Sequence, residues 1–398
     1  MKTSLFGYGG TTKSLAKVLE DVVFYDDKCH KPFVDENGWS VKPSSEFDPR
    51  YSQREIPSPG IAPSNPLIQK AQNLLSEYDY FATSKPLKIW ISGTNGKTTT
   101  TQMMQHLLNH KNAQSGGNIG TPLAQLSQES ALWILETSSF TMHYTNIAKP
   151  NIYVLLPLSP DHLTWHGSMS EYEAAKLKPL SMMSEGEIAI IPHKYKDIKT
   201  DAFVVPYKDE NDLAKYFGID ISQVPFQGAF LLDALLAMSV DKILFDCINY
   251  EKIASFILEA HRQEELRDMQ NRLWVNDTKA TNLDATKVAI KRYEANFIHL
   301  VLGGDDKGVN LEELFEFMQN KKLHIYAIGS NKEKLLKLAK DYQLEATLCK
   351  NLIDAIKNID KKLTSKEVAL LSPAAASLDE YNSYAERGNE FKKNVLSL

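Results

Sequence analysis

Short apolar runs alternate with amphipathic stretches along most of the 398-residue chain. A nearly continuous apolar run between turn residues is typical of a strand buried on both faces of a parallel sheet. Runs of this kind occupy residues 4–6, 22–25, 89–91, 131–135, 152–156, 188–191, 202–205, 273–275, 299–302, 324–328 and 368–371. Apolar spacing or helical composition predicts helices between them, at 66–75, 230–238, 311–318 and 334–338. The alternation of strands and helices predicts an α/β protein with parallel sheets.

The stretch from Leu87 to Thr100 combines an apolar run, a glycine-containing turn, a Gly-Lys-Thr sequence and a helical pattern. This order is typical of a phosphate-binding P-loop, in which backbone N–H groups and a helix N-terminus face the anion. The glycine that usually stands five residues before the Gly-Lys pair is replaced by Ile91 and comes later, at Gly93. We therefore predict a nucleoside triphosphate site in a shortened loop. Its residues are Gly93, Thr94, Asn95, Gly96, Lys97, Thr98 and Thr99.

A second glycine-containing turn lies near the N-terminus, in a predicted strand–helix–strand unit over residues 3–28. The turn at 7–12 resembles a dinucleotide-binding fingerprint, with Thr12 in place of the third glycine. Asp26 follows about twenty residues later, where an acidic residue commonly meets a ribose. The turn indicates a phosphate or nucleotide site. A plain Rossmann-like turn and an NAD-dependent oxidoreductase remain alternatives.

Length and strand grouping predict three domains, because 398 residues exceed what one core usually supports. We expect a Rossmann-like domain over 1–84, a central P-loop ATPase-type domain over 85–259 and a second Rossmann-like domain over 260–398. A net charge of −5 argues against a nucleic-acid partner. The three scattered cysteines indicate a reducing compartment, and neither a signal peptide nor a membrane span is visible. We expect a cytoplasmic monomer without membrane insertion.

Polar residues that can bind metal follow two strands of the central domain. Glu136 comes directly after the run 131–135 and could hold Mg²⁺ together with Thr98; complementing a helix dipole is the alternative. The loop 159–166 follows the next run and contains Asp161, His162 and His166. These side chains indicate a second metal or a substrate contact, although a structural histidine is equally compatible. By composition alone, Lys176 is typical of a surface position.

Three polar loops follow strands of the last domain, at 276–282, 303–308 and 372–379. The carboxyl ends of parallel strands meet at one edge of an open sheet, so Lys279, Lys307 and Ser377 are expected to converge there. Cations and hydroxyl groups at that edge would suit an anionic substrate.

Taken together, these motifs resemble the Mur ligases of peptidoglycan synthesis. The resemblance covers essentially the whole chain in the family's order. It rests on 93–98, 117–120, 135–140, His162, 174–176, 261–262 and 276–282. The stretches 372–381 and 387–391 are similar to the branch of the family that adds D-glutamate to UDP-N-acetylmuramoyl-L-alanine.

The resemblance implies an ATP-dependent amide ligase that works through an acyl phosphate, with Mg²⁺ at two sites and a carbamylated Lys176. The implied catalytic residues are Lys97, Asn118, His162 and Lys176, and the implied metal neighbours are Thr98, Glu136, His162 and Lys176. ATP would also contact Arg262, Asp277 and Lys279. The implied contacts of the UDP-linked substrate are Gly10, Thr11, Asp26, Ser58 and Gly60, and those of D-glutamate are Thr281, Lys307, Ser377 and Tyr384.

The chain departs from the family pattern in its adenine segment. Ala229, Phe230 and Asp233 stand where a His-Asn pair and a second Asn are usual, so Phe230 can stack or pack but cannot hydrogen-bond through its side chain. Asp27 and Lys28 replace a common Thr-Arg pair. A sister Mur ligase or a folylpolyglutamate-type ligase with another amino-acid substrate is the alternative reading, and a P-loop switch is a further one.

Overall fold

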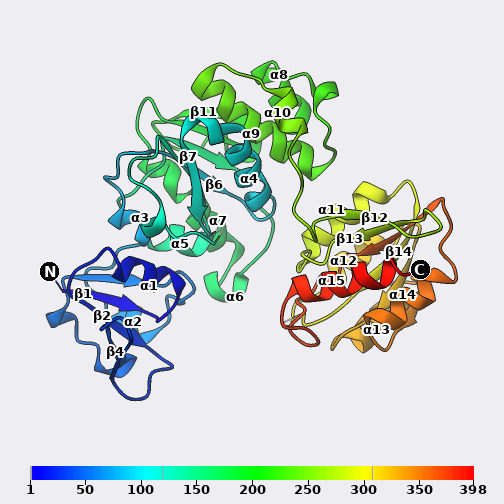
Figure 1. Cartoon of the computed structure of the whole chain (residues 1–398), viewed down its shortest axis with the longest axis horizontal. Coiled ribbons are helices and arrows are strands. Elements are labelled where there is room, and N and C mark those ends of the chain that lie inside the picture. The colour runs from blue at the N-terminus through cyan, green and yellow to red at the C-terminus, as the bar shows by residue number, and fades with distance from the viewer. Residues whose placement is uncertain (1, 119, 307) are drawn as a thin grey trace. The chain divides into compact units, whose positions relative to one another are not determined.

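The computed structural model describes residues 2–118, 120–306 and 308–398. The described residues form three sheets, of five, six and six strands. Figure 1 shows the ribbon of the chain with many of its helices and strands labelled. By their contacts they divide into two units: the chain up to Phe226 together with Phe230–Phe256, and Gln227–Ala229 together with Ile257–Leu398. The first unit holds the first two sheets, and the second unit holds the third. The predicted α/β class is confirmed.

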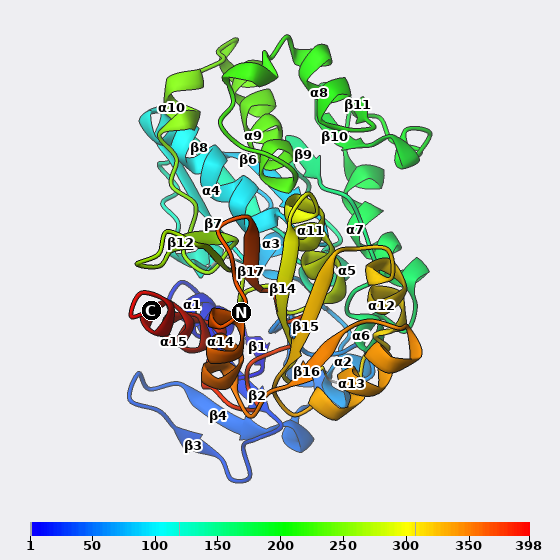
Figure 2. The ribbon, with the colours of Figure 1, turned by 90° about the vertical axis from the view of Figure 1, so that its right-hand side faces the viewer.

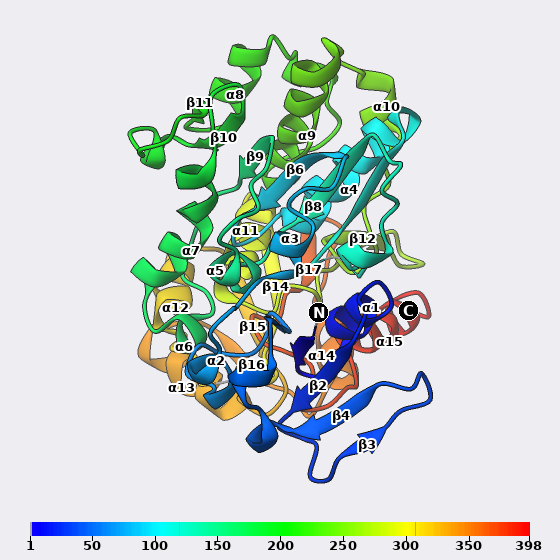
Figure 3. The ribbon, with the colours of Figure 1, turned by 90° about the vertical axis from the view of Figure 1, so that its left-hand side faces the viewer.

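The first sheet is parallel apart from its short edge strand β3 and has the strand order β3-β4-β2-β1-β5. Its strands are β1 (Thr3–Phe6), β2 (Val22–Asp26), β3 (Phe33–Val34), β4 (Ser40–Pro43) and β5 (Arg54–Pro57), with helices α1 (Gly10–Ala16), α2 (Pro66–Lys70) and α3 (Glu77–Tyr80). Figure 3 shows β2 and β4 side by side. Leu5, Phe24 and Ile56 form part of its core.

The helix predicted over 66–75 ends early. Helix α2 stops at Lys70, where Ala71 takes extended backbone. The following chain pairs with the outer edge of β5, because Glu55 donates its N–H to Asn73 and accepts from the N–H of Leu75. The unpaired polar groups of a sheet edge thus compete successfully with the helix for the backbone of this segment.

The second sheet is entirely parallel, in the order β11-β10-β9-β6-β8-β7. Its strands are β6 (Leu87–Ser92), β7 (Ala113–Gly117), β8 (Leu132–Glu136), β9 (Ile152–Leu155), β10 (Ile188–Pro192) and β11 (Phe203–Tyr207). Its helices are α4 (Lys97–Leu108), α5 (Ser139–Tyr144), α6 (Leu163–His166), α7 (Met169–Met182), α8 (Glu210–Phe217), α9 (Ala229–Phe245) and α10 (Tyr250–Ala254). Trp90, Trp133 and Tyr153 are buried together on one face. Because β6 lies between β8 and β9, the loops after all three strands are neighbours.

The third sheet has the order β12-β13-β17-β14-β15-β16 and is parallel except for β12. Its strands are β12 (Glu264–Arg267), β13 (Leu273–Asn276), β14 (Phe297–Leu302), β15 (Leu323–Ala327), β16 (Ala346–Leu348) and β17 (Glu367–Leu371). Its helices are α11 (Leu283–Tyr293), α12 (Glu312–Met318), α13 (Lys332–Asp341), α14 (Leu352–Asp360) and α15 (Tyr384–Val395). Figure 2 shows β14, β15 and β16 side by side. Two separate apolar clusters cover the faces of this sheet.

Two further findings concern the whole described chain. All three cysteines are free, as their scattered positions indicated. Among the residues that the structure describes, none of the helices combines the length and the apolar character that a membrane crossing requires.

Candidate active site

The predicted P-loop joins β6 to α4, and its glycines explain its unusual spacing. Gly93 has φ +147°, and a Cβ there would lie 2.5 Å from the Cβ of Leu156. Gly96 has φ +84°, and a Cβ there would lie 2.5 Å from Oδ1 of Asp233. Both positions therefore require glycine for backbone conformation and for space. Helix α4 begins at Lys97, immediately after Gly96, so its first N–H groups point into the loop.

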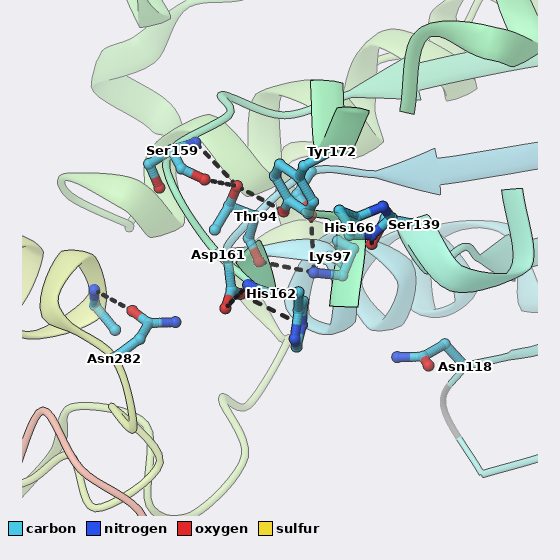
Figure 4. Close-up of polar contacts among 12 residues, drawn as sticks. Thr94, Lys97, Asn118, Ser139, Ser159, Asp161, His162, His166, Tyr172 and Asn282 are labelled. Carbon is cyan, nitrogen blue, oxygen red and sulfur yellow. Dashed lines mark hydrogen bonds and ion pairs between the residues drawn. The ribbon is translucent and has the colours of Figure 1, made fainter. Parts of the chain in front are cut away.

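Lys97 and Thr94 give the loop its polar contacts, which Figure 4 shows. The ammonium group of Lys97 donates to the carbonyl oxygens of Gly93, at 2.9 Å, and Thr94, at 2.7 Å. The hydroxyl group of Thr94 lies 3.0 Å from both the backbone N and O of Ser159 and 3.0 Å from the hydroxyl of Tyr172. The P-loop is thereby fastened to the loop after β9 and to α7.

Glu136 and Asn118 lie together beside this loop. Glu136 ends β8, is 2% exposed, and accepts a hydrogen bond of 2.6 Å from the Asn118 amide through Oε1. Its other oxygen, Oε2, is buried and has no hydrogen-bond partner among the described residues. A buried carboxylate oxygen without a donor is costly unless a cation or another donor meets it. The donor set therefore fits a metal ion.

His162 lies on the exposed side of the same region. It has φ +52° and begins α6, and its Nε2 lies 3.5 Å from Oδ2 of Asp161. Its ring meets Phe140 edge-on at 4.7 Å between centroids. The neighbouring His166 lies 2.9 Å from the hydroxyl of Ser139, and burial is the main cause that lowers its pKa to about 4. His166 is therefore a neutral hydrogen-bonding group at pH 7.

Lys176 is not at the surface, contrary to what its composition context alone indicates. It is 1% exposed, and its ammonium group donates to Gly93 O at 2.9 Å and to the Ser92 hydroxyl at 3.3 Å. Burial, together with repulsion from Lys97, holds its pKa well below the usual range of a lysine. A buried amine that is readily deprotonated and lies beside the P-loop is suited to a role in the reaction. A lysine that only keeps the protein surface hydrated would be exposed.

No cluster of three or more His, Cys, Asp and Glu side chains with metal-binding geometry occurs in 2–118, 120–306 and 308–398. This is compatible with Mg²⁺, which usually takes one or two protein carboxylates and completes its shell with waters and substrate phosphates.

The N-terminal turn is shaped by its own polar side chains. Asp26 accepts from the N–H groups of Tyr8, at 2.6 Å, and Lys28, at 2.7 Å. The hydroxyl of Thr12, which replaces the third glycine of the fingerprint, donates to Gly7 O at 2.6 Å. Helix α1 begins at Gly10, and Thr11 follows in its first turn. Asp26 therefore holds the turn in shape, whatever further contact it makes.

The departures in the adenine segment have a structural explanation. Asp233 is 2% exposed and accepts a hydrogen bond of 2.9 Å from the hydroxyl of Thr100 in α4. Phe230 is 8% exposed, so it packs within the protein. Asp233 therefore contacts the P-loop helix through Thr100 and occupies the space that a Cβ at Gly96 would need.

In the second unit, Asp277 and Lys279 follow β13. Asp277 is buried, which raises the pKa of its carboxyl group to about 7, and it accepts from the hydroxyl of Ser372 at 2.8 Å. The Lys279 ammonium lies 3.8 Å from Glu259 and 5.2 Å from the ring centroid of Tyr384. The structure thus brings together Lys279 and Tyr384, which were expected to serve ATP and D-glutamate.

The other expected residues of this unit lie before β12 and in the loops after β13, β14 and β17. Arg262 lies 3.6 Å from Glu259 through Nε. Ser377 is 3% exposed in the loop after β17, whereas Thr281 is exposed after β13. Lys307 lies outside the described residues. The loops after β13 and β17 meet where the Ser372 hydroxyl bonds to Asp277; the convergence of Lys279, Lys307 and Ser377 at this edge stays a prediction.

Arg387 begins the stretch 387–391, which resembles the family, but the sequence predicts no role for it. It is 1% exposed, and its guanidinium donates to Thr278, Gly303, Ala375 and Ala376. Each of these acceptors belongs to one of the three loops that follow β13, β14 and β17. Its position among charged neighbours in the sequence gave no sign of this burial.

Comparison with known proteins agrees with this arrangement. Residues 91–229 match the Mur ligase middle domain. The chain is 53% identical over 402 residues to a UDP-N-acetylmuramoylalanine–D-glutamate ligase of Campylobacter jejuni, with 100% of both chains covered. It is 44% identical over 420 residues to the Helicobacter pylori enzyme of the same name, again over 100% of both.

Among solved structures, the fold is similar to that of MurF ligase from Thermotoga maritima in complex with ADP. The TM-score is 0.59 and the identity 17%, over 87% of this chain and 90% of that chain. A P-loop sheet with a buried lysine and carboxylate, in this fold, defines the chain as a member of the Mur ligase family. Within that family, its full-length identities join it to the UDP-N-acetylmuramoylalanine–D-glutamate ligases. The resemblance drawn from the motifs is confirmed.

Proposed function

We propose that this chain joins D-glutamate to UDP-N-acetylmuramoyl-L-alanine and converts ATP to ADP and phosphate. The observation that carries the proposal is identity with named D-glutamate ligases over the whole chain. The P-loop, Glu136 and Lys176 supply the matching chemistry.

The reaction has two steps. A carboxylate oxygen of the alanyl group attacks the γ-phosphorus of ATP, so an acyl–phosphate bond forms and ADP leaves. The neutral amine of D-glutamate then attacks the acyl carbon, phosphate leaves from the tetrahedral intermediate, and the nitrogen loses a proton. Stabilisation of developing charge is the main demand on the protein in the first step.

The P-loop meets that demand with fixed donors. Backbone N–H groups at the start of α4 hold the phosphates, and Lys97 neutralises charge on the transferring group. In the structure, the Lys97 ammonium already bonds to two carbonyls of the loop, which keeps it within the loop. Asn118 keeps the Glu136 carboxylate in place through their 2.6 Å bond.

The residues present fit Mg²⁺. Thr98 and Glu136 would hold one ion, as the unpartnered Oε2 of Glu136 supports; His162 and a carbamylated Lys176 would hold a second. Mg²⁺ bound there offsets the negative charge of the phosphates and of the acyl phosphate.

Lys176 suits carbamylation on physical grounds. Burial favours its neutral amine, which is the form that attacks CO₂; a carbamate forms and one proton is released. The product is an anion where an ammonium group would repel Lys97. Modification therefore changes an unfavourable buried cation into a ligand for a metal.

The remaining substrate contacts are proposed from the resemblance to the Mur ligases. We assign Gly10, Thr11, Asp26, Ser58 and Gly60 to the UDP-linked substrate. We assign Arg262, Asp277 and Lys279 to ATP, and Thr281, Lys307, Ser377 and Tyr384 to D-glutamate.

The proposal extends to organisation and location. We propose the domains 1–84, 85–259 and 260–398 as, in turn, the UDP-substrate, ATP and amino-acid domains. We propose that the protein acts as a monomer in the cytoplasm.

The test is an amino-acid specificity assay. Purified protein with ATP and Mg²⁺ is expected to release phosphate only when both UDP-N-acetylmuramoyl-L-alanine and D-glutamate are present. L-Glutamate is the matched control, because it differs only in configuration. Equal release with L-glutamate, or with a dipeptide-bearing acceptor, would contradict the proposal and favour a sister ligase.

A further inference from the structure

Two aromatic side chains, from helices that follow strands of the second sheet, donate hydrogen bonds to a loop of the first sheet. The hydroxyl of Tyr144 donates a hydrogen bond of 2.6 Å to Ile61 O. The indole N–H of Trp165 donates one of 3.3 Å to Gly60 O. Both acceptors are consecutive carbonyls of the loop that follows β5. Neither Tyr144 nor Trp165 is among the site residues expected from the sequence, whereas Gly60 is.

The same loop supports the N-terminal glycine turn. The N–H of Ser58 donates to Phe6 O at 2.8 Å, and a Cβ at Gly7 would lie 3.2 Å from the Cβ of Ser58 and 3.4 Å from Ile61. The turn and the loop after β5 are therefore hydrogen-bonded and packed against each other. Any displacement of Gly60 and Ile61 would disturb the backbone that begins α1.

On the other side, the two aromatic residues belong to the helices that start at the catalytic edge. Helix α5, which ends at Tyr144, begins three residues after Glu136; helix α6, which holds Trp165, begins directly after His162. The Trp165 ring lies 4.7 Å from Phe140 and 6.0 Å from Tyr144 between centroids. Tyr144 is 3% exposed, so its hydroxyl bond is shielded from water.

We propose that Tyr144 and Trp165 are positioning residues that hold the loop 58–61 in register with the catalytic edge. This inference rests on the proposed function, in which that loop and the glycine turn bind the UDP-linked substrate. The substrate spans from the nucleotide turn to the P-loop, and its carboxylate must reach the γ-phosphate in a defined orientation. Because the loop 58–61 is hydrogen-bonded to α5 and α6, it fixes the distance between the nucleotide turn and the P-loop.

The test uses variants that remove one donor each. Trp165→Phe removes the indole N–H, and Tyr144→Phe removes only the hydroxyl. Losing one hydrogen bond of ordinary strength weakens an equilibrium by about three- to tenfold. We expect each variant to raise the KM for UDP-N-acetylmuramoyl-L-alanine by about that factor, with the KM values for ATP and D-glutamate unchanged. The Kd of the UDP-linked substrate, measured by calorimetry without ATP, rises equally.

Tyr216→Phe is the matched control, since Tyr216 is 55% exposed in α8. Thermal unfolding shows whether each variant is folded; should Tyr144→Phe unfold, the half-buried Trp165 still provides the test. An unchanged Kd in folded Trp165→Phe, or a fall in kcat alone, would overturn the inference. Failure of the proposed function is distinguishable, because wild-type protein would then bind the UDP-linked substrate without ligating D-glutamate.

Discussion

Lys176 is a buried, ionisable side chain in the proposed active site, and its environment is unusual for a lysine. An ammonium group with 1% exposure, near a second lysine, loses much of its hydration without gaining a counter-ion in direct contact. Its bonds go to Gly93 O and the Ser92 hydroxyl, so it lies against the P-loop itself. The proposed carbamylation, which would turn this side chain into an anion, would account for both its burial and its place.

Replacing Lys176 with alanine is expected to lower kcat by at least about a hundredfold, comparable to the loss of one charge-stabilising group. Short carboxylic acids such as formate or acetate are expected to restore part of the rate, because they can fill the space of the carbamate. The measurement is phosphate release with and without added acid, together with a carbamate signal in carbon-13 NMR of wild-type protein under labelled CO₂. The exposed Lys215→Ala in α8 serves as the control. Wild-type rates in Lys176→Ala would remove this lysine from the site.

Most residues of the P-loop and the strand ends could be predicted because their chemistry is local. Strand, glycine turn and Gly-Lys-Thr follow each other in sequence, and Glu136 directly follows an apolar run. Lys176 was identified only through the family resemblance. One local signal was available: Tyr172, Lys176 and Leu180 are spaced by four and form the buried side of α7. Because lysine is a charged residue, Lys176 does not count as part of an apolar face when the spacing is read from the sequence.

At the scale of secondary-structure elements, the long apolar strands were predicted, whereas β3, β4, β5, β7, β12 and β16 were not, and all of these except β4 lie at sheet edges. Helix ends were also predicted less well. Buried parallel strands are continuous apolar runs, so each run listed from the sequence marks a strand or its edge. Helix α2 was predicted too long because the partner that ends it, the free edge of β5, lies eighteen positions earlier in sequence, at Glu55 against Asn73. Competition between local helix propensity and distant pairing is decided by tertiary structure.

Arg387 joins separate elements of the third sheet and offers a test at this scale. Its planar fork donates to loops after β13, β14 and β17 at once, with distances from 2.9 to 3.5 Å. Lysine keeps the charge but has three donors on a single nitrogen and cannot reproduce this spread. We expect Arg387→Lys to lower the free energy of unfolding by about 2–3 kcal/mol, because buried carbonyls lose their donors.

The same variant is expected to raise the KM for D-glutamate more than the KM for ATP, since Ser377 follows directly after Ala375 and Ala376. Urea unfolding and steady-state kinetics are the measurements. Arg50→Lys is the control, because Arg50 pairs with Asp48 at the surface and exposed ion pairs contribute little. A stable variant with an unaltered KM for D-glutamate would mean that the loops hold their shape without this arginine.

At the scale of the whole molecule, we propose that the two sheets of the first unit have different functions, one in substrate binding and the other in activation by ATP. The first sheet presents a glycine turn and the loop 58–61, and the second presents the P-loop with Glu136 and Lys176. The hydrogen bonds of Tyr144 and Trp165 join the two sheets at the loop 58–61. Binding of the UDP-linked substrate and activation of its carboxylate are then separable functions of two sheets that these bonds join, together with others such as the 2.7 Å bond from Gln125 to Ser14.

This division predicts different effects of one substitution on binding and on catalysis. Lys97→Ala removes the cation that neutralises the transferring phosphoryl group, so kcat is expected to fall by about a hundred- to thousandfold. The Kd of UDP-N-acetylmuramoyl-L-alanine is expected to stay within about twofold, because the first sheet does not contain Lys97. Calorimetry without ATP and phosphate-release kinetics measure the two quantities, and the exposed Lys199→Ala is the control. A large loss of affinity for the UDP-linked substrate in Lys97→Ala would show that the P-loop itself binds this substrate, and the proposed division between the sheets would then be wrong.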